Sequence, residues 1–282
     1  MGAQAGSHFC LYLKSLSSGL PHTINPGGGV ACGGEVEEKK IKLVIAYDGS
    51  AYHGWQRQQN ALTLQQVFEE KLEKMLGEPI RIFASGRTDA GVHALGQVVH
   101  FSTHSKLDPD TIKKGLNSLL PEDIFVKEVG YAAPEFHARY SARRKTYEYR
   151  ILNTVSPDIF QRRYVWHIRK KLDNEGMRRS LALILGKHDF SAFRSSGSGN
   201  RNPVRTMYRA DLVEGSAGRL RILMEADGFL RHMVRNLVGT LVEVGQGKMT
   251  TEEFGAVLHS GDRSMAGPKA PANGLFLAKV NY

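Results

Sequence analysis

The sequence predicts an α+β fold built from two similar halves. In the first half, the predicted elements follow the order β-α-β-β-α-β, the order of a ferredoxin-like α/β sandwich with helices on one face of a mainly antiparallel sheet. A second, looser succession of strands and helices follows. With 41% hydrophobic and 23% charged residues, the 282-residue chain has the composition of a globular protein and the length of two ordinary domains.

Turn and capping signals delimit the elements of the first half. An apolar run at 41–47 ends in an Asp-Gly pair, which is typical of turns. Thr63 and Gln66 predict a capping box for the next helix, whose apolar residues keep helical spacing. A second helix is expected after Asp108. Further strands are expected at 80–83, 97–101 and 124–129.

The second half combines short strands with one long amphipathic helix. We expect this helix from about 229 to 244, because Phe229, Met233, Leu237 and Leu241 form an apolar stripe. The other elements are strands around 146–152, 164–168, 204–213, 220–226 and 275–280, and helices capped by Asp173 and Thr250.

These elements divide the chain into three segments. Residues 1–38 are rich in Gly, Ser and Pro and show no periodicity, so we expect a disordered extension. Residues 39–138 are expected to form an N-terminal α+β domain. Residues 139–282 are expected to form a C-terminal α+β domain that carries a basic surface.

The charge balance indicates a polyanionic partner. The formal net charge is +10 and the pI is about 9.6. Nucleic acid is favoured over a membrane surface, because there is neither a basic amphipathic helix nor an apolar run of the roughly 20 residues that a spanning helix needs. The two cysteines both lie in the extension, and the rest of the chain has the character of a reduced, cytoplasmic protein.

Several kinds of cofactor site are not indicated. The sequence has no GxGxxG motif, and the Gly-Lys pair at 247–248 lacks the Ser or Thr of a phosphate-binding loop. There is no Cys/His cluster, and His100 alternates with apolar residues as a packed strand histidine does. We therefore expect neither a metal nor an organic cofactor, and chemistry from carboxylates, tyrosines and arginines.

The most distinctive stretch is FASGRTDAGVHALGQVVHF, from Phe83 to Phe101. Its glycines allow a tight loop between two strands, and the loop carries Arg87 and Asp89. A nearby guanidinium favours the ionised carboxylate, which suits a nucleophile. The pattern fits equally well an aspartate that only braces a glycine turn.

Basic residues are concentrated between Arg139 and Arg179. This stretch contains twelve Lys and Arg residues but only four Asp and Glu residues. Tyrosines and a tryptophan interleave with them. Cations mixed with flat stacking surfaces favour looped or single-stranded RNA over duplex DNA. A solvated strand face with core aromatics is the alternative.

The long helix contains two arginines, Arg231 and Arg235, one turn apart. Arg235 is flanked by Val234 and Leu237, so it should lie near the apolar boundary and have an anionic partner there. Either a substrate phosphate or a catalytic carboxylate would serve. A surface arginine with a buried stem is the other reading.

Long blocks of the sequence resemble the TruA family of tRNA pseudouridine synthases. They occur in the family's order and cover about 41–282. The blocks are IAYDGSAYHGWQRQ, GRTDAGVHALGQVVHF, FHAR, RRKTYEYRI, HDFSAFRSSG, HMVRNLVG and GLFLAKV.

The resemblance implies a role for each matching residue. Asp89 corresponds to the catalytic nucleophile, with Arg87 as the arginine of the same motif. Tyr147 corresponds to a tyrosine that contacts the target base, and Arg235 to the arginine that pairs with the catalytic aspartate. Leu275 corresponds to a residue of the pocket wall. The expected RNA contacts are Tyr147, Leu275, Arg139, Arg143, Arg144, Lys145, Gln56 and Arg57.

The resemblance further implies the reaction, the partner and the assembly. Uridine would be isomerised to pseudouridine at positions 38, 39 and 40 of the tRNA anticodon stem-loop. A cofactor-free homodimer with a continuous central sheet and a basic cleft would bind the tRNA. The flipped base would be attacked by Asp89, with a transient bond either to the ribose or to the uracil ring. A non-catalytic RNA-binding protein and a nucleosidase with paired carboxylates are the alternatives.

Overall fold

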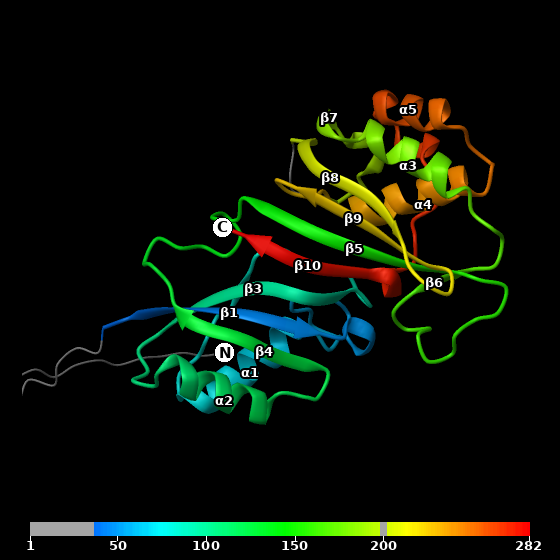
Figure 1. The fold of residues 1–282 in the computed structure, drawn as a ribbon. Helices are drawn as coiled ribbons and strands as arrows, with labels where there is room; N and C mark the ends of the chain where they lie inside the picture. Colours follow the sequence, from blue (N-terminus) through cyan, green and yellow to red (C-terminus); the bar gives the residue numbers. More distant parts are fainter. Residues whose placement is uncertain (1–36, 198–201) are drawn as a thin grey trace, which may run out of the picture. The chain divides into compact units, whose positions relative to one another are not determined.

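The computed structural model of the protein describes residues 37–197 and 202–282 (Figure 1). The extension predicted over 1–38 lies outside the described residues, apart from its last two. The remainder is one compact unit. One sheet contains strands from both sides of the predicted boundary at 138/139, and the division into two domains stays a prediction.

Ten strands of the described residues form one sheet. Its main path runs β4-β1-β3-β10-β5-β9-β8-β7, while β2 pairs with β3 and β6 pairs with β5. All pairs are antiparallel except β10 with β3 and β5 with β6. The strands are β1 (Lys39–Tyr47), β2 (Phe83–Ala84), β3 (His93–Thr103), β4 (Ile124–Tyr131), β5 (Arg144–Asn153), β6 (Trp166–Ile168), β7 (Gly186–Asp189), β8 (Val204–Glu214), β9 (Arg219–Ala226) and β10 (Leu275–Asn281).

The C-terminal strand joins the two halves of the sheet. Leu277 of β10 pairs with Ala94 of β3 on one side and with Tyr147 of β5 on the other. The strand that follows the loop of Asp89 therefore lies close to the strand that carries Tyr147. The predicted α+β class with a mainly antiparallel, continuous sheet is confirmed.

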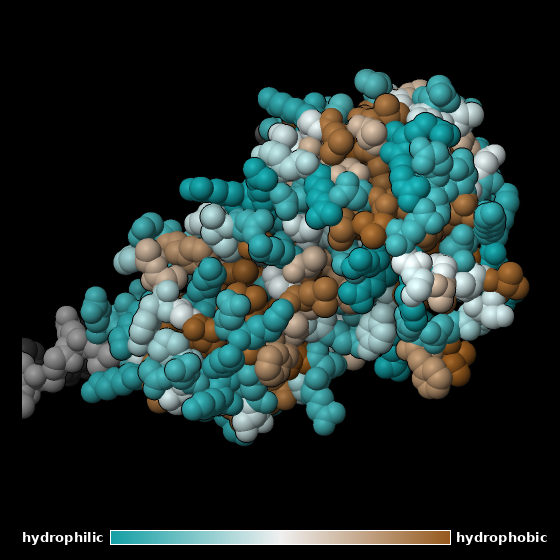
Figure 2. All heavy atoms as spheres, viewed as in Figure 1, coloured by the Kyte–Doolittle hydropathy of each residue, from teal (hydrophilic) through white to brown (hydrophobic). Residues whose placement is uncertain are grey.

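Two groups of helices pack on the two halves of the sheet (Figure 1). The apolar faces of α1 (Leu64–Leu76) and α2 (Pro109–Leu119) cover the first half. The second half carries α3 (Asn174–Leu183), α4 (Met233–Gly245) and α5 (Thr251–Ser260). Figure 2 shows hydrophilic residues over most of the viewed face, with apolar patches between them. No helix in the described ranges is long and apolar enough to cross a membrane.

Three local features differ from the sequence prediction. The long helix begins at Met233 and not near 229, because His232 has a left-handed backbone with a φ of 61°. At α1, Thr63 caps the backbone N–H of Gln66, but the Gln66 side chain bonds to Glu70 instead of returning to the cap. Strand β7 was not predicted. The capping box of α5, by contrast, is complete as expected.

Candidate active site in a basic cleft

The loop that carries Asp89 is fixed at its start by a buried glutamine. Ser85 donates its backbone N–H to the carbonyl of Val98 on β3. The fully buried side chain of Gln97 contacts the hydroxyl of Ser85 at 2.5 Å and donates to the carbonyl of Gly86 at 2.8 Å. The loop therefore leaves the sheet in a defined direction.

The residue before Asp89 is held from three sides. The Thr88 hydroxyl bonds to the buried hydroxyl of Tyr47 at 2.8 Å, and the Thr88 carbonyl accepts from the backbone of Trp55 at 3.0 Å. Gly54, with a φ of 91°, packs so closely that an added Cβ would lie 2.7 Å from that carbonyl. Only glycine permits this approach. These contacts fix the backbone next to Asp89.

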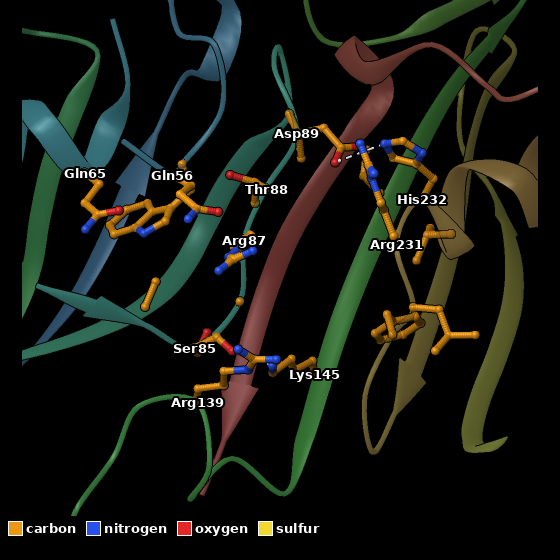
Figure 3. Close-up of a pocket in the computed structure, with 18 of the residues that line it drawn as sticks. Gln56, Gln65, Ser85, Arg87, Thr88, Asp89, Arg139, Lys145, Arg231 and His232 are labelled. Carbon is orange, nitrogen blue, oxygen red and sulfur yellow. Dashed lines mark hydrogen bonds and ion pairs between the residues drawn. The ribbon is translucent and has the colours of Figure 1, made fainter. Parts of the chain in front are cut away.

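The carboxylate of Asp89 has two basic neighbours. Its Oδ2 lies 2.8 Å from Nη1 of Arg235, and its Oδ1 lies 3.5 Å from Nε2 of His232. Figure 3 shows Asp89 and His232 facing each other. The Asp89 side chain keeps 31% of its surface exposed, so the carboxylate is both anchored and open to the cleft.

Helix α4 and the segment before β10 hold Arg235 in place. Its Nε donates to the carbonyl of Ala270 at 2.8 Å, and Ala270 donates back to the carbonyl of Arg235 at 3.0 Å. Close packing supports this pairing, since a Cβ on Gly239 would overlap the carbonyl of Pro268. The Arg235 side chain is 10% exposed. A guanidinium fixed in this way has little freedom to leave Asp89.

His232 was not among the site residues predicted from the sequence. It precedes α4, its side chain is 13% exposed, and its Nδ1 has no partner among the described residues. Burial lowers its pKa; Asp89 opposes this shift, while Lys269, Arg235 and Arg231 reinforce it. The imidazole is therefore neutral near pH 7. Helical spacing gave no signal for this residue, because His232 lies just before α4 in a left-handed backbone conformation.

Tyr147 and Leu275 line the cleft from neighbouring strands. Tyr147 is 9% exposed, and its ring meets Phe229 edge-on at 4.9 Å. Burial raises the pKa of Tyr147 well above its usual value, and the nearby Tyr47 and Asp89 add to the rise. The phenol is therefore neutral and can donate a hydrogen bond.

The cleft has a volume of about 1590 Å³. Small-molecule pockets measure about 300–1,000 Å³, so this cleft has room for more than one nucleotide. All four residues with proposed catalytic roles line it. Of the predicted RNA contacts, it includes Tyr147, Leu275, Arg139, Lys145 and Gln56, but not Arg57, Arg143 or Arg144.

Arg87 is not a partner of Asp89. Its side chain is exposed in the cleft, and it forms no ion pair with a carboxylate of the described residues. Arg57 and Arg144, outside the cleft, pair with Glu69 at 3.1 Å and with Glu225 at 3.2 Å.

Two of the aromatic residues in the basic stretch belong to the core. Tyr149 is fully buried and Tyr147 nearly so. Tyr140 is 76% exposed and lines the cleft, with the guanidinium of Arg139 5.6 Å from its ring centroid. Periodicity alone had not separated this exposed ring from its buried neighbours.

His100, outside the cleft, is a packed strand histidine. His100 is 4% exposed, and its Nδ1 accepts from the backbone of Ala138 at 3.1 Å. Burial lowers the pKa of His100 to about 4, and the nearby His137 and Lys40 add to the fall. Within 37–197 and 202–282, no three His, Cys, Asp or Glu side chains gather as a metal site would require.

Comparison with known proteins identifies the family. A family model described as tRNA pseudouridine synthase matches residues 43–141 and 181–282. The tRNA pseudouridine synthase A of Thermoanaerobacter sp. (strain X514) is 44% identical over 245 residues, 86% of this chain and 100% of that protein. That of Geobacillus sp. (strain WCH70) is 46% identical over 245 residues, 86% and 98% of the two chains. The chain therefore belongs to the tRNA pseudouridine synthase family, and it is an isomerase that acts on tRNA.

Proposed function

We propose that this enzyme isomerises uridine to pseudouridine at positions 38, 39 and 40 of the tRNA anticodon stem-loop, with Asp89 as the nucleophile. One observation carries the proposal. The Asp89 carboxylate is anchored at 2.8 Å by Arg235 and still has 31% of its side chain exposed in a basic cleft. An anchored, accessible carboxylate is suited to covalent catalysis.

The target base must leave its stack to reach Asp89. Flipping a nucleotide out of its stack costs a few kcal/mol of free energy. This cost is smallest for a base that is already poorly paired. A cleft of about 1590 Å³ has room for the flipped nucleotide and part of the adjoining strand. Arg87 and Tyr140 provide an exposed cation and an exposed ring on its walls, which suit an unstacked RNA segment.

The proposed chemistry rearranges bonds within one nucleotide. Asp89 forms a transient covalent bond with the uridine, and the glycosidic bond between C1′ and N1 breaks. The base then rotates, a new bond joins C1′ to C5, and the transient bond to Asp89 breaks, which restores the free carboxylate. The proton on C5 leaves while N1 gains one, so the product is an isomer of the substrate and no co-reactant is consumed.

Arg235 and Tyr147 have distinct roles in this proposal. Arg235 orients the Asp89 carboxylate through the 2.8 Å ion pair. Tyr147 supplies a neutral phenol in a largely dry wall, where it can donate a hydrogen bond to a uracil oxygen. Leu275, 5% exposed, excludes water beside it.

The resemblance to the TruA family also leads us to propose a homodimer in the cytoplasm. Sedimentation equilibrium of the full-length protein tests the assembly. Twice the 31.3 kDa chain mass is expected, and the mass of a single chain at working concentration would overturn it.

The decisive experiment maps pseudouridine in unmodified tRNA incubated with the wild-type enzyme and with Asp89→Asn. We expect product at positions 38–40 with the wild type and none with the variant, although the variant still binds tRNA. Asp211→Asn is the matched control, because Asp211 is 47% exposed and, among the described residues, forms its one ion pair with Arg209. Normal product from Asp89→Asn would overturn the nucleophile assignment, and release of free uracil would instead identify a nucleosidase.

A further inference from the structure

A cationic pair lies at the other end of the loop that carries Asp89. Lys145 of β5 and Arg139 of the preceding segment both line the cleft, and Figure 3 shows them together with Ser85. Arg139 is close enough to lower the pKa of Lys145. The two side chains therefore concentrate positive charge at one point of the wall.

The ammonium of Lys145 has no carboxylate partner. Its Nζ donates to the carbonyl of Ser85, and it forms neither another hydrogen bond nor an ion pair within the described part of the chain. An ammonium has three donors, so two of them remain for a ligand. Burial, with Arg139 and Arg205 as like charges, lowers the pKa of Lys145 to about 8.

The guanidinium of Arg139 also has no carboxylate partner among the described residues. Its backbone N–H bonds to Nδ1 of His137, and its guanidinium lies 5.6 Å from the centre of the Tyr140 ring. No carboxylate of the described residues forms an ion pair with it. Arg139 is exposed, whereas Lys145 is half-buried, and a buried cation is ordinarily paired. Two unpaired cations that share one wall of a cleft indicate a ligand that brings negative charge.

We propose that Lys145 and Arg139 form a phosphate subsite that anchors the RNA backbone beside the flipped uridine. This inference rests on the proposed function, because it takes the ligand to be the tRNA strand whose uridine reaches Asp89. The two side chains complement each other in binding a phosphate group. Lys145 provides a point charge and Arg139 a planar fork, and both donate to phosphate oxygens.

The loop sets which phosphate the subsite can reach. Ser85, the partner of Lys145, stands four residues before Asp89. Four residues span at most about 14 Å, so the anchored phosphate belongs to the target nucleotide or a near neighbour. Arg87 lies between the two ends of the loop (Figure 3). The subsite would therefore fix the register of the strand while the base turns toward Asp89.

The first test measures the affinity of Lys145→Gln for an unmodified anticodon stem-loop RNA with uridine at position 39. Glutamine keeps a donor for the Ser85 carbonyl and removes the charge. We expect Kd to rise roughly ten- to a hundredfold, as for the loss of a hydrogen bond to a charged group. The slope of log Kd against log salt should fall by about 0.7–0.9, the value for one lost phosphate contact.

Lys127→Gln is the matched control. Lys127 also donates to a backbone carbonyl, that of Leu95 at 3.1 Å, but it is exposed and lies outside the cleft. Lys145→Arg should restore most of the affinity. It should also remove the weakening of wild-type binding above pH 8, where the free lysine loses its proton and must regain it to bind. Equal Kd values for Lys145→Gln and Lys127→Gln would overturn the subsite.

A second test locates the phosphate. Neutral methylphosphonate linkages are placed one at a time around residue 39, and each RNA is bound to the wild type and to Lys145→Gln. At one linkage the neutral group should weaken wild-type binding but have little further effect on the variant, since both changes remove the same contact. Additive losses at every linkage would overturn the proposal. Failure of the wild type to form pseudouridine would count against the proposed function instead, because these measurements read binding alone.

Discussion

Arg235 and Lys145 are two poorly exposed cations in one cleft, and their surroundings differ in a decisive way. Arg235 meets a carboxylate, Asp89, at 2.8 Å and a backbone carbonyl, Ala270, at 2.8 Å. Lys145 meets only the carbonyl of Ser85 among the residues that the structure describes. The protein thus neutralises one of the two charges and leaves the other open.

The difference separates a charge that serves catalysis from one that serves binding. A buried ion pair is preorganised, so Asp89 reaches the substrate already oriented. An unpaired cation destabilises the free enzyme, and its cost is recovered only when an anion arrives. We therefore expect substitutions of Arg235 to lower activity and stability, and substitutions of Lys145 to lower the affinity for tRNA.

The largest effect is expected from Arg235→Met. Without the guanidinium, Asp89 loses its anchor and becomes an ion in a partly buried site. We expect kcat for pseudouridine formation to fall about 10²–10³-fold, the scale of losing one preorganised electrostatic contact. Thermal unfolding should shift down, while affinity for tRNA changes little.

Arg235→Lys sharpens this result. Lysine keeps the charge but lacks the fork that reaches Ala270 and Asp89 together. Its kcat should lie between those of the wild type and Arg235→Met. A kcat for Arg235→Met within tenfold of the wild type would show that the ion pair is dispensable.

Lys145→Met should have the opposite effect on stability. Methionine fills a similar volume and removes an uncompensated charge, but the Ser85 carbonyl loses its donor. The first effect is larger, so the free energy of unfolding should rise by about 1–2 kcal/mol near pH 7. For a chain of this size that corresponds to about 2–8 °C in Tm. Binding of tRNA should weaken in the same variant. A lower Tm would show that the Lys145 ammonium stabilises the free enzyme.

The stability gain of Lys145→Met should depend on pH. The pKa of Lys145 is lowered from 10.5 to about 8 in the folded state, mainly by burial. Below pH 8 both folded and unfolded wild type carry the proton, so the cost of the buried charge is fully present. Between pH 8 and 10.5 only the folded state has released it, and the wild type gains stability with rising pH. The difference in Tm between the variant and the wild type should therefore shrink over this interval.

Local sequence signals predicted most of the fold but not the pairing at the site. Caps and apolar spacing defined α1, α2 and α5, because these signals act within a few residues. The ion pair of Asp89 and Arg235 joins positions 146 residues apart. Periodicity could only indicate that Arg235 needed an anion; the family motifs supplied Asp89 as that anion.

The sequence could not show which cations lack an acidic partner or which aromatic rings are exposed. Lys145 stood among twelve basic residues, and only three-dimensional packing distinguishes its unpaired ammonium from Arg144, which has Glu225. Tyr149 and Tyr140 looked alike in sequence, yet one is fully buried and the other 76% exposed. His232 lies beside Asp89 with a left-handed backbone conformation, which no helical pattern predicts.

The smallest effect is expected from Arg144→Gln, next to Lys145 on β5. The Arg144 guanidinium pairs with Glu225 at 3.2 Å and lies 4.2 Å from the centre of the Tyr208 ring, and its side chain is 50% exposed outside the cleft. Exposed ion pairs contribute about 0–1 kcal/mol, so Tm should barely move. Because Glu225 already offsets its charge, we expect Kd for the stem-loop RNA to rise less than about threefold, against ten- to a hundredfold for Lys145→Gln. Equal losses in the two variants would show that net charge along β5, and not the missing carboxylate at Lys145, determines the affinity.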